Sequence, residues 1–201
     1  MLRQNSPGRL FVLALTLSVL ALLVSVSPSE APAAKRSTGH VSISRMIAPV
    51  DVCPTQPATR KKHRARAKRA MACMTNYARR QVGLRKLRPM RRLNHSARMK
   101  ARDILRCDQF SHNACGRSVL YWFKRVGYVG RVCRYISENI AWGGGPLGNT
   151  RNIFTALMHS RGHREAILSR QYTVVGNGVV RGNMRGHRGA GVWAQHFGGG
   201  C

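Results

Sequence analysis

Apolar residues recur every three or four positions in several stretches of the chain, and this spacing predicts amphipathic helices. In residues 63–81 they are interleaved with Arg and Lys, and Gly83 follows as a stop signal. A second such stretch covers residues 89–106, where Pro89 suits the first turn of a helix. The same pattern predicts helices at residues 117–126 and from an N-cap at Thr150 to about residue 161.

The pattern changes near the C-terminus, where it indicates strands. Residues 172–180 are rich in Val and Thr, and residues 190–197 alternate between larger apolar and other side chains. Residues 181–189 between them are polar and Gly-rich, as expected of a hairpin connection. Helices that precede a late strand pair predict an α+β fold, in which a small antiparallel sheet is covered by helices.

The N-terminus has the layout of a secretory signal peptide. Residues 10–26 are apolar apart from small hydroxyl side chains, basic residues precede them, and Ala31-Pro32-Ala33 follows. We therefore expect residues 1–33 to be removed and the protein to be secreted. Because the apolar run is near the shortest length that spans a bilayer, an uncleaved membrane anchor is the alternative. Residues 34–62 contain Pro, Ser, Thr and basic residues and predict a flexible segment before one domain at residues 63–201.

All six cysteines follow the leader, so in an oxidising compartment they are disulfide candidates. Cys107 ends a predicted helix and Cys115 follows a short loop that contains His112, so a bridge there would brace the loop. A zinc site of these same three residues is the alternative, but it lacks the second pair of ligands that a structural site needs. The expected pairs are Cys53–Cys73, Cys107–Cys115 and Cys133–Cys201.

The charge of the chain is extreme, because 35 Lys and Arg residues face only 6 acidic ones and give a formal net charge of +29. No helix-turn-helix, ribonucleoprotein motif or zinc-finger spacing accompanies this charge, so we expect no specific nucleic-acid partner. The cationic surface instead favours attraction to anionic polymers or lipid headgroups of a cell envelope.

Several sequence blocks carry a family resemblance by their order. Residues 137–143, Ser-Glu-Asn-Ile-Ala-Trp-Gly, place Glu138 among apolar residues in a chain with few carboxylates. Phe-Ser-His at residues 110–112 precedes this block, and the segment 160–168 with His163 follows it. With Val-Gly-Asn-Gly-Val at 175–179 and Gln-His-Phe-Gly at 195–198, the blocks resemble the CAP superfamily, and most closely its bacterial, secreted, single-domain SCP-like members.

This resemblance implies an α-β-α sandwich with a cleft into which His112, Glu138 and His163 project. Eukaryotic relatives line that cleft with two histidines and two glutamates, which hold a divalent metal. Here Ser160 stands at the position of the second glutamate. The resemblance therefore implies, at most, a weakly held Zn or Ca ion on His112, Glu138 and His163.

We accordingly expect a monomeric binding module that acts at or outside the cell envelope, with an unidentified ligand such as a lipid or an envelope polymer. No residue is assigned a catalytic role. Three alternatives stay open. One is a metal-assisted hydrolase with Glu138 as its base. The second is a polyanion-binding protein that uses its arginine-rich surface. In the third, Glu138 only ties down a loop beside packed histidines.

Overall fold

The computed structural model describes residues 41–54, 63–129 and 135–200. The expected signal peptide, Cys133 and Cys201 lie outside the described residues. Among the helices of the described part, none is both long and apolar enough to cross a membrane.

Four strands form one mixed sheet at the centre of the described structure, in the order β1-β3-β4-β2. Strands β2 and β3 are antiparallel to β4, and the short β1 is parallel to β3. The sequence had suggested a purely antiparallel sheet. The observed sheet is mixed because β1, in the segment that leads into α3, pairs in parallel with β3. The strands are β1 (Arg88–Pro89), β2 (Tyr135–Gly143), β3 (Val174–Met184) and β4 (His187–Gly199).

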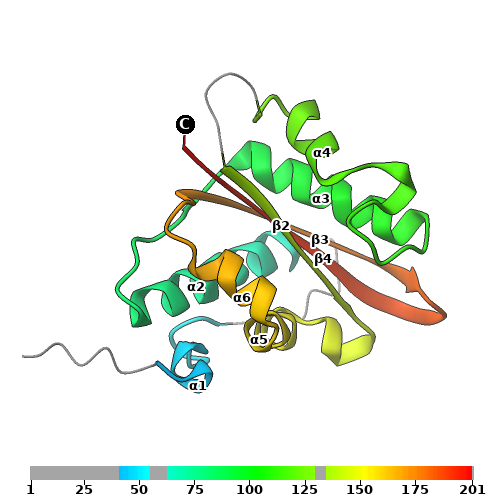
Figure 1. The fold of residues 1–201 in the computed structure, drawn as a ribbon. Coiled ribbons are helices and arrows are strands. Elements are labelled where there is room, and N and C mark those ends of the chain that lie inside the picture. The colour runs from blue at the N-terminus through cyan, green and yellow to red at the C-terminus, as the bar shows by residue number, and fades with distance from the viewer. Residues whose placement is uncertain (1–40, 55–62, 130–134, 201) are drawn as a thin grey trace, which may run out of the picture. The chain divides into compact units, whose positions relative to one another are not determined.

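Helices cover both faces of this sheet, so the α+β class and the α-β-α sandwich are confirmed (Figure 1). The side chains of β4 alternate between two cores: Trp193 and Phe197 pack with α2, α5 and α6, whereas Val192 and Ala194 pack with α3. Helix α4 packs against α3. The helices are α2 (Arg64–Gln81), α3 (Arg91–Arg106), α4 (Val119–Arg125), α5 (Thr150–His159) and α6 (Arg161–Leu168).

The hairpin between β3 and β4 is tighter than expected. Its turn consists of Arg185 and Gly186, both with positive φ (47° and 78°), which matches the twist of the flanking strands. Residues 181–189 were predicted to be a loop, but most of them belong to the two strands. They are polar because this end of the hairpin lies largely in solvent.

Helix α3 lies unusually close to β3, because two glycines of the strand leave room for it. A Cβ atom on Gly176 would overlap the main chain of Leu93 and Asn94, and one on Gly178 would overlap the main chain of Arg98. This close approach brings polar side chains of α3 down onto the sheet, where they meet residues of β2 and β4.

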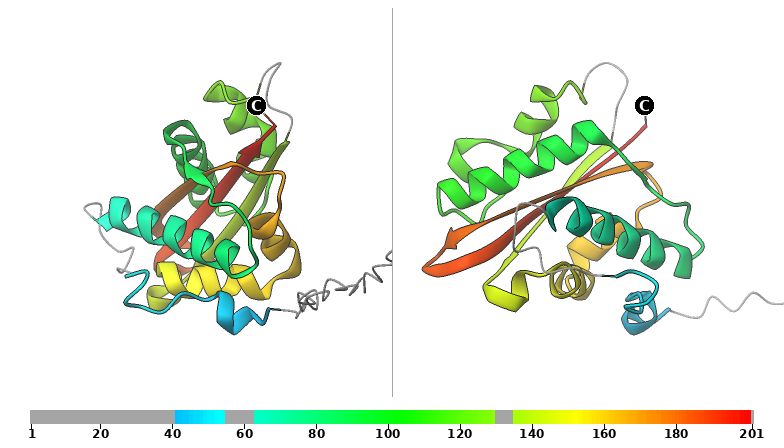
Figure 2. Two further views of the ribbon diagram at one scale, coloured as in Figure 1. Left: turned by 90° about the vertical axis from the view of Figure 1, so that its left-hand side faces the viewer. Right: turned by 180° about the vertical axis from the view of Figure 1, so that it is seen from behind.

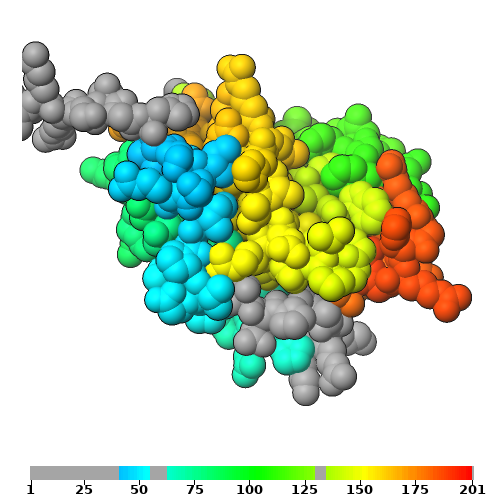
Figure 3. Space-filling model, turned by 90° about the horizontal axis from the view of Figure 1, so that it is seen from below, coloured from blue at the N-terminus to red at the C-terminus, as the bar shows by residue number. Residues whose placement is uncertain are grey.

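The segment before α2 was predicted to be part of a flexible stretch, but its described residues are packed against the domain core. Residues 41–54 contain the short helix α1 (Ile43–Met46), and Met46 and Ala48 belong to the core shared by α2, α5 and α6. Arg151 of α5 donates a hydrogen bond from Nη1 to the carbonyl oxygen of Ala48 (2.7 Å). In Figure 3 this segment, blue to cyan, lies against α5 and α6. Its apolar positions are too few to reveal a helical period.

Both disulfides predicted within the described residues are confirmed. Cys53–Cys73 ties the segment before α2 to that helix, and Cys107–Cys115 closes the loop after α3. Because Cys107 and Cys115 are bonded to each other, the alternative of a zinc site with His112 is wrong.

Candidate functional site

Glu138 lies in β2 directly opposite His196 of β4, and both side chains point to the face of the sheet that α3 covers. The Glu138 side chain is only 1% exposed, and its two oxygens have separate partners. Oε1 accepts from Nδ1 of His112 (2.7 Å), and Oε2 accepts from Nε2 of His196 (2.8 Å). The buried Nζ of Lys100 lies 3.8 Å from Oε1. Three nitrogen-bearing groups thus surround one carboxylate.

These contacts keep Glu138 ionised. Burial by itself would raise the pKa of Glu138, but hydrogen bonds from His112 and His196 and the nearby charge of Lys100 leave that pKa lowered. An ionised carboxylate only accepts hydrogen bonds, so the facing nitrogens of both histidines carry the protons.

His196 is fully buried, and its ring stacks on Phe123 of α4 with centroids 4.3 Å apart. Its Nδ1 lies 2.8 Å from Oγ of Ser96. Burial lowers the pKa of His196 despite the opposing effect of Glu138, which favours a neutral ring. In that ring Nε2 donates to Glu138, and Nδ1 and the carbonyl oxygen of Leu93 (3.0 Å from Oγ) are both acceptors for the single hydrogen of the Ser96 hydroxyl. Sequence reasoning did not assign a role to either residue.

Lys100 fixes the loop that carries His112. Its side chain is fully buried in α3, and its Nζ donates to the carbonyl oxygens of His112 and Arg117, the latter at 3.3 Å. Burial lowers the pKa of Lys100, whereas Glu138 and Asp103 oppose that shift. The loop that carries His112 is therefore fixed by the buried ammonium group of Lys100 as well as by the Cys107–Cys115 disulfide.

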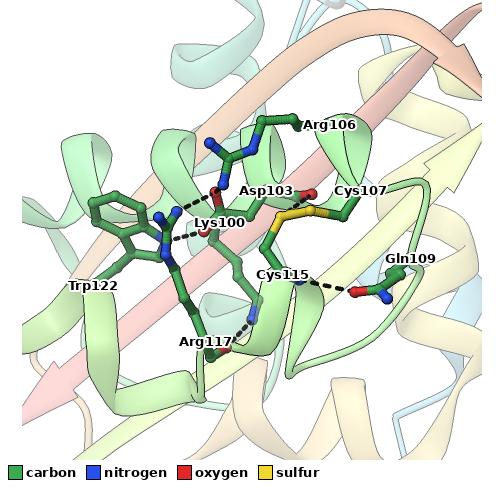
Figure 4. Close-up of a disulfide and its surroundings, with 8 residues drawn as sticks. All are labelled: Lys100, Asp103, Arg106, Cys107, Gln109, Cys115, Arg117 and Trp122. Atoms are coloured by element: carbon green, nitrogen blue, oxygen red, sulfur yellow. Dashed lines mark hydrogen bonds and ion pairs between the residues drawn. A yellow bond between two sulfur atoms is a disulfide. The ribbon is translucent and has the colours of Figure 1, made fainter.

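Asp103 of α3 forms a second anchor for this region (Figure 4). Its Oδ2 accepts from Nε1 of Trp122 (2.6 Å), and its Oδ1 accepts from Arg117 (2.7 Å). Arg106 also donates to Oδ1, at 3.3 Å. The Asp103 side chain is 3% exposed, so its carboxylate is largely desolvated, whereas the side chains of Arg117 and Arg106 are 28% and 61% exposed. The first two hydrogen bonds join α3 to Trp122 of α4 and to Arg117, which lies between the His112 loop and α4.

His163 reaches the same region from the opposite layer, at the start of α6. Its Nδ1 lies 2.8 Å from Oγ of Ser160, and its carbonyl oxygen accepts from Asn139 of β2 (3.1 Å). Burial and the charge of His112 both lower the pKa of His163. The described hydrogen bonds of His163 join it to Ser160 and Asn139, and none joins it to His112 or Glu138. A cleft shared by all three residues stays a prediction.

The metal set expected from the sequence does not fit this arrangement. Both Glu138 oxygens are committed to histidines, and the side chain is almost completely buried. Across residues 41–54, 63–129 and 135–200, no group of three or more His, Cys, Asp or Glu side chains is placed to hold a metal ion. Only the imidazoles of His112 and His163 remain as candidate ligands, and the His112 side chain is 48% exposed.

Comparison with known proteins agrees with this architecture. At 30% identity over 126 residues, the chain is similar to the uncharacterised protein YkwD of Bacillus subtilis, covering 62% of this chain and 44% of that protein. It therefore spans less than half the length of this relative.

Solved structures show the same fold. One is an extracellular protein of Bacillus anthracis that contains an SCP domain, with a TM-score of 0.54, 21% identity and coverage of 66% of this chain and 40% of that one. Another is an outer surface protein of Borrelia burgdorferi, with a TM-score of 0.56, 14% identity and coverage of 73% and 98%. Residues 74–197 match the model of the cysteine-rich secretory protein (CAP) family. Since that match spans more than half of the chain, the protein belongs to the CAP family.

Proposed function

We propose that this protein is a binding module that acts outside the cell, and that its ligand site is formed by the imidazoles of His112 and His163. Support for an extracellular location comes from the leader-like N-terminus, from the disulfides and from the extracellular and surface relatives. The single observation that carries the binding role is the position of Glu138, which is buried and bonded to histidines through both oxygens.

A buried carboxylate of this kind orients an imidazole. Because Nδ1 of His112 donates to Glu138, the lone pair of the neutral ring lies on Nε2, at the other edge of a half-exposed side chain. In metal and ligand sites, a carboxylate behind a histidine fixes the tautomer and ring orientation in this way. The lowered pKa of His163 likewise favours a neutral imidazole at pH 7.

A pair of imidazoles suits a borderline-soft cation better than calcium, which prefers oxygen ligands. We infer that a zinc ion would be held by His112 and His163 with water completing its coordination, and that Glu138 would act on it only through His112. Two protein ligands predict weak binding, since structural zinc sites use four.

The same observation favours binding over metal-assisted hydrolysis. A general base must reach a water or substrate proton, but both oxygens of Glu138 face histidines and its side chain is 1% exposed. A hydrolase that used Glu138 as its base would first have to break the bond to His112 or to His196.

Zinc titration by calorimetry tests the proposal. We expect His112→Ala and His163→Ala each to weaken zinc binding at least tenfold. We expect Glu138→Gln to weaken it roughly 10- to 100-fold by releasing the His112 ring. His187→Ala, at an exposed position on β4, is the matched control and should leave the affinity unchanged.

Two results would contradict this function. The first is zinc affinity that is the same in the wild type, His112→Ala and His163→Ala, because the ion would then bind elsewhere. The second is turnover of a peptide, ester or glycan substrate that a chelator abolishes and that Glu138→Gln lacks, because Glu138 would then act as a base.

A further inference from the structure

A cationic groove runs between α2 and α3, and neither histidine of the proposed ligand site lines it. It consists of two adjoining cavities of about 430 and 340 Å³, which share Lys68 and Asn94 in their linings. We call it the β3-edge groove, because Asn177 and Val179 of β3 line it. Seen from behind in Figure 2, β3 passes between α3 and α2.

The positive charge of the groove follows from helical spacing. On α2, Arg64 and Lys68 are four residues apart and therefore share one stripe of the helix. Arg69 and Arg80 of the same helix line the groove from other positions. On α3, Arg91 and Arg98 are seven residues apart and also share a stripe. Lys86, from the connection between the helices, lines the same groove. Two helices in different layers thus direct cations toward one strand edge.

Within the described part of the chain, no acidic side chain neutralises these cations. None of the described residues that line the two cavities is acidic. Asp103 and Glu138 are buried in other contacts, Glu165 pairs with Arg161, and Asp108 accepts from the N–H of Arg185. Of the other two acidic residues, Asp51 makes none of the ion pairs found in the described part of the chain, and Glu30 lies outside that part.

One main-chain N–H on the floor of the groove is directed away from β4. Beyond the two-residue β1, strand β3 is an edge strand, and the Asn177 N–H is bonded to Oδ1 of Asn94 (2.8 Å) rather than to another strand. In an antiparallel pair every second residue turns its main-chain groups outward, so Val179 directs its N–H to the same side. Edge strands flanked by charges are protected from pairing with other strands, which alone would explain a few lysines. Protection of an edge strand does not explain why arginines from two helices line the same groove.

We propose that the β3-edge groove binds an extended chain of phosphate groups that carries no bases. Arginine guanidinium groups form paired hydrogen bonds with phosphate oxygens, and several aligned cations gain affinity by releasing the counterions of a polyanion. No Phe, Tyr or Trp is among the described residues that line the groove, and His95 supplies one imidazole ring there, so the groove lacks the series of aromatic rings on which successive bases stack in single-stranded nucleic-acid sites. This site is separate from the imidazole site and does not depend on it.

Inorganic polyphosphate, labelled at one end and titrated by fluorescence anisotropy, is the probe. Seven Lys and Arg residues line the groove. If six of them contact phosphates, the slope of log affinity against log salt should be about −4, so that affinity falls roughly 300-fold between 50 and 200 mM salt. In the double variant Lys68→Gln/Arg98→Gln the slope should be less steep by about 1.4, with at least tenfold weaker binding at 50 mM salt.

The matched control is Lys124→Gln/Arg125→Gln, which removes the same net charge from exposed positions on α4. Helix α4 lies on the other side of α3 from α2 (Figures 1 and 2). This control should bind nearly as tightly as the wild type. Thermal melting of both variants checks that they are folded. If the first variant is unfolded, Arg80→Gln/Arg91→Gln, at exposed groove positions, replaces it.

Three outcomes would overturn the proposal. Equal weakening in the groove variant and the α4 control would mean that binding follows net charge. Tighter binding of a single-stranded DNA oligonucleotide or of a sulfated glycan than of polyphosphate would assign the groove to another class of polymer. A wild-type protein that does not bind polyphosphate at 50 mM salt would refute it outright. Zinc titration of the same variants should be unaffected, so this proposal and the imidazole site can fail separately.

Discussion

Replacing Glu138 by glutamine is the most direct test of the buried charge network. Glutamine keeps the shape of the side chain but removes its charge and turns one acceptor into an NH₂ donor. In the wild type, the two oxygens accept from His112 and His196, and Lys100 lies 3.8 Å from Oε1. In the variant, one histidine therefore faces a donor, and the buried ammonium group of Lys100 loses its nearest carboxylate.

The expected cost is large because these groups are shielded from water. The side chains of Glu138 and Lys100 are 1% and 0% exposed, so water does not replace the lost contacts. Removal of one partner from a buried charge pair typically costs about 3–5 kcal/mol. For a domain of this size, each kcal/mol lowers the midpoint of thermal unfolding by about 2–4 °C, so the shift should be roughly 6–20 °C.

Urea denaturation at pH 7 and thermal melting measure this effect. Glu165→Gln is the matched control, because Glu165 forms a surface pair with Arg161 and its side chain is 62% exposed. The control should change the free energy of unfolding by less than about 1 kcal/mol. If Glu138→Gln also changes it by less than 1 kcal/mol, the carboxylate does not hold this network together, and our account of how His112 is oriented is wrong.

Three further predictions concern stability. Burial lowers the pKa of His196 below its usual value of 6.5, so the stability that its neutral form supplies should be complete above about pH 6.5 and should decline as the pH falls from there. Urea titrations at pH 5, 6 and 7 measure this decline, and a free energy of unfolding that does not change with pH contradicts the prediction. Asp103→Asn should cost about 3 kcal/mol in urea denaturation, with altered Trp122 fluorescence, because a desolvated carboxylate joins α3 to α4; a loss below 1 kcal/mol contradicts this. Gly178→Ala should cost more than about 3 kcal/mol in the same assay, because its Cβ would overlap the main chain of α3. Gly162→Ala, with open space around it, should be neutral or stabilising, and equal effects of the two variants contradict the close approach of α3 to β3.

The elements that could be predicted from the sequence have one apolar, buried face and one polar, solvent-exposed face. Helix α2 was predicted within one residue of its observed bounds because its apolar positions contrast with arginines on the solvent side. Strand β2 was missed for the opposite reason. Residues 138–140 are all buried, since helices cover both faces of the sheet, so the period-two contrast that marks a half-exposed strand is absent.

The partners of Glu138 were only partly predictable. His112 was identified through the family resemblance, but Ser96, Lys100 and His196 depend on how closely α3 approaches the sheet. One signal was available for Lys100. It lies three residues after Ala97 and four before Ile104, on the apolar stripe of α3, where a lysine must be buried or break the pattern. A buried lysine requires an acceptor or an acid nearby, and this chain has few acids.

The buried hydrogen-bonded series Ser96–His196–Glu138 has the order of groups found in hydrolytic triads, but its buried position gives it a structural role. In such a triad the serine must reach a substrate carbonyl, and the histidine must shuttle its proton. Here Ser96 and His196 are both 0% exposed, and the Ser96 Oγ lies between the imidazole and the carbonyl oxygen of Leu93, inside the packing of α3 on the sheet. No substrate can reach that oxygen while α3 stays in place. This series therefore fixes the rotamer and charge of Glu138, which leaves His112 as the member of this hydrogen-bonded network that can meet a ligand.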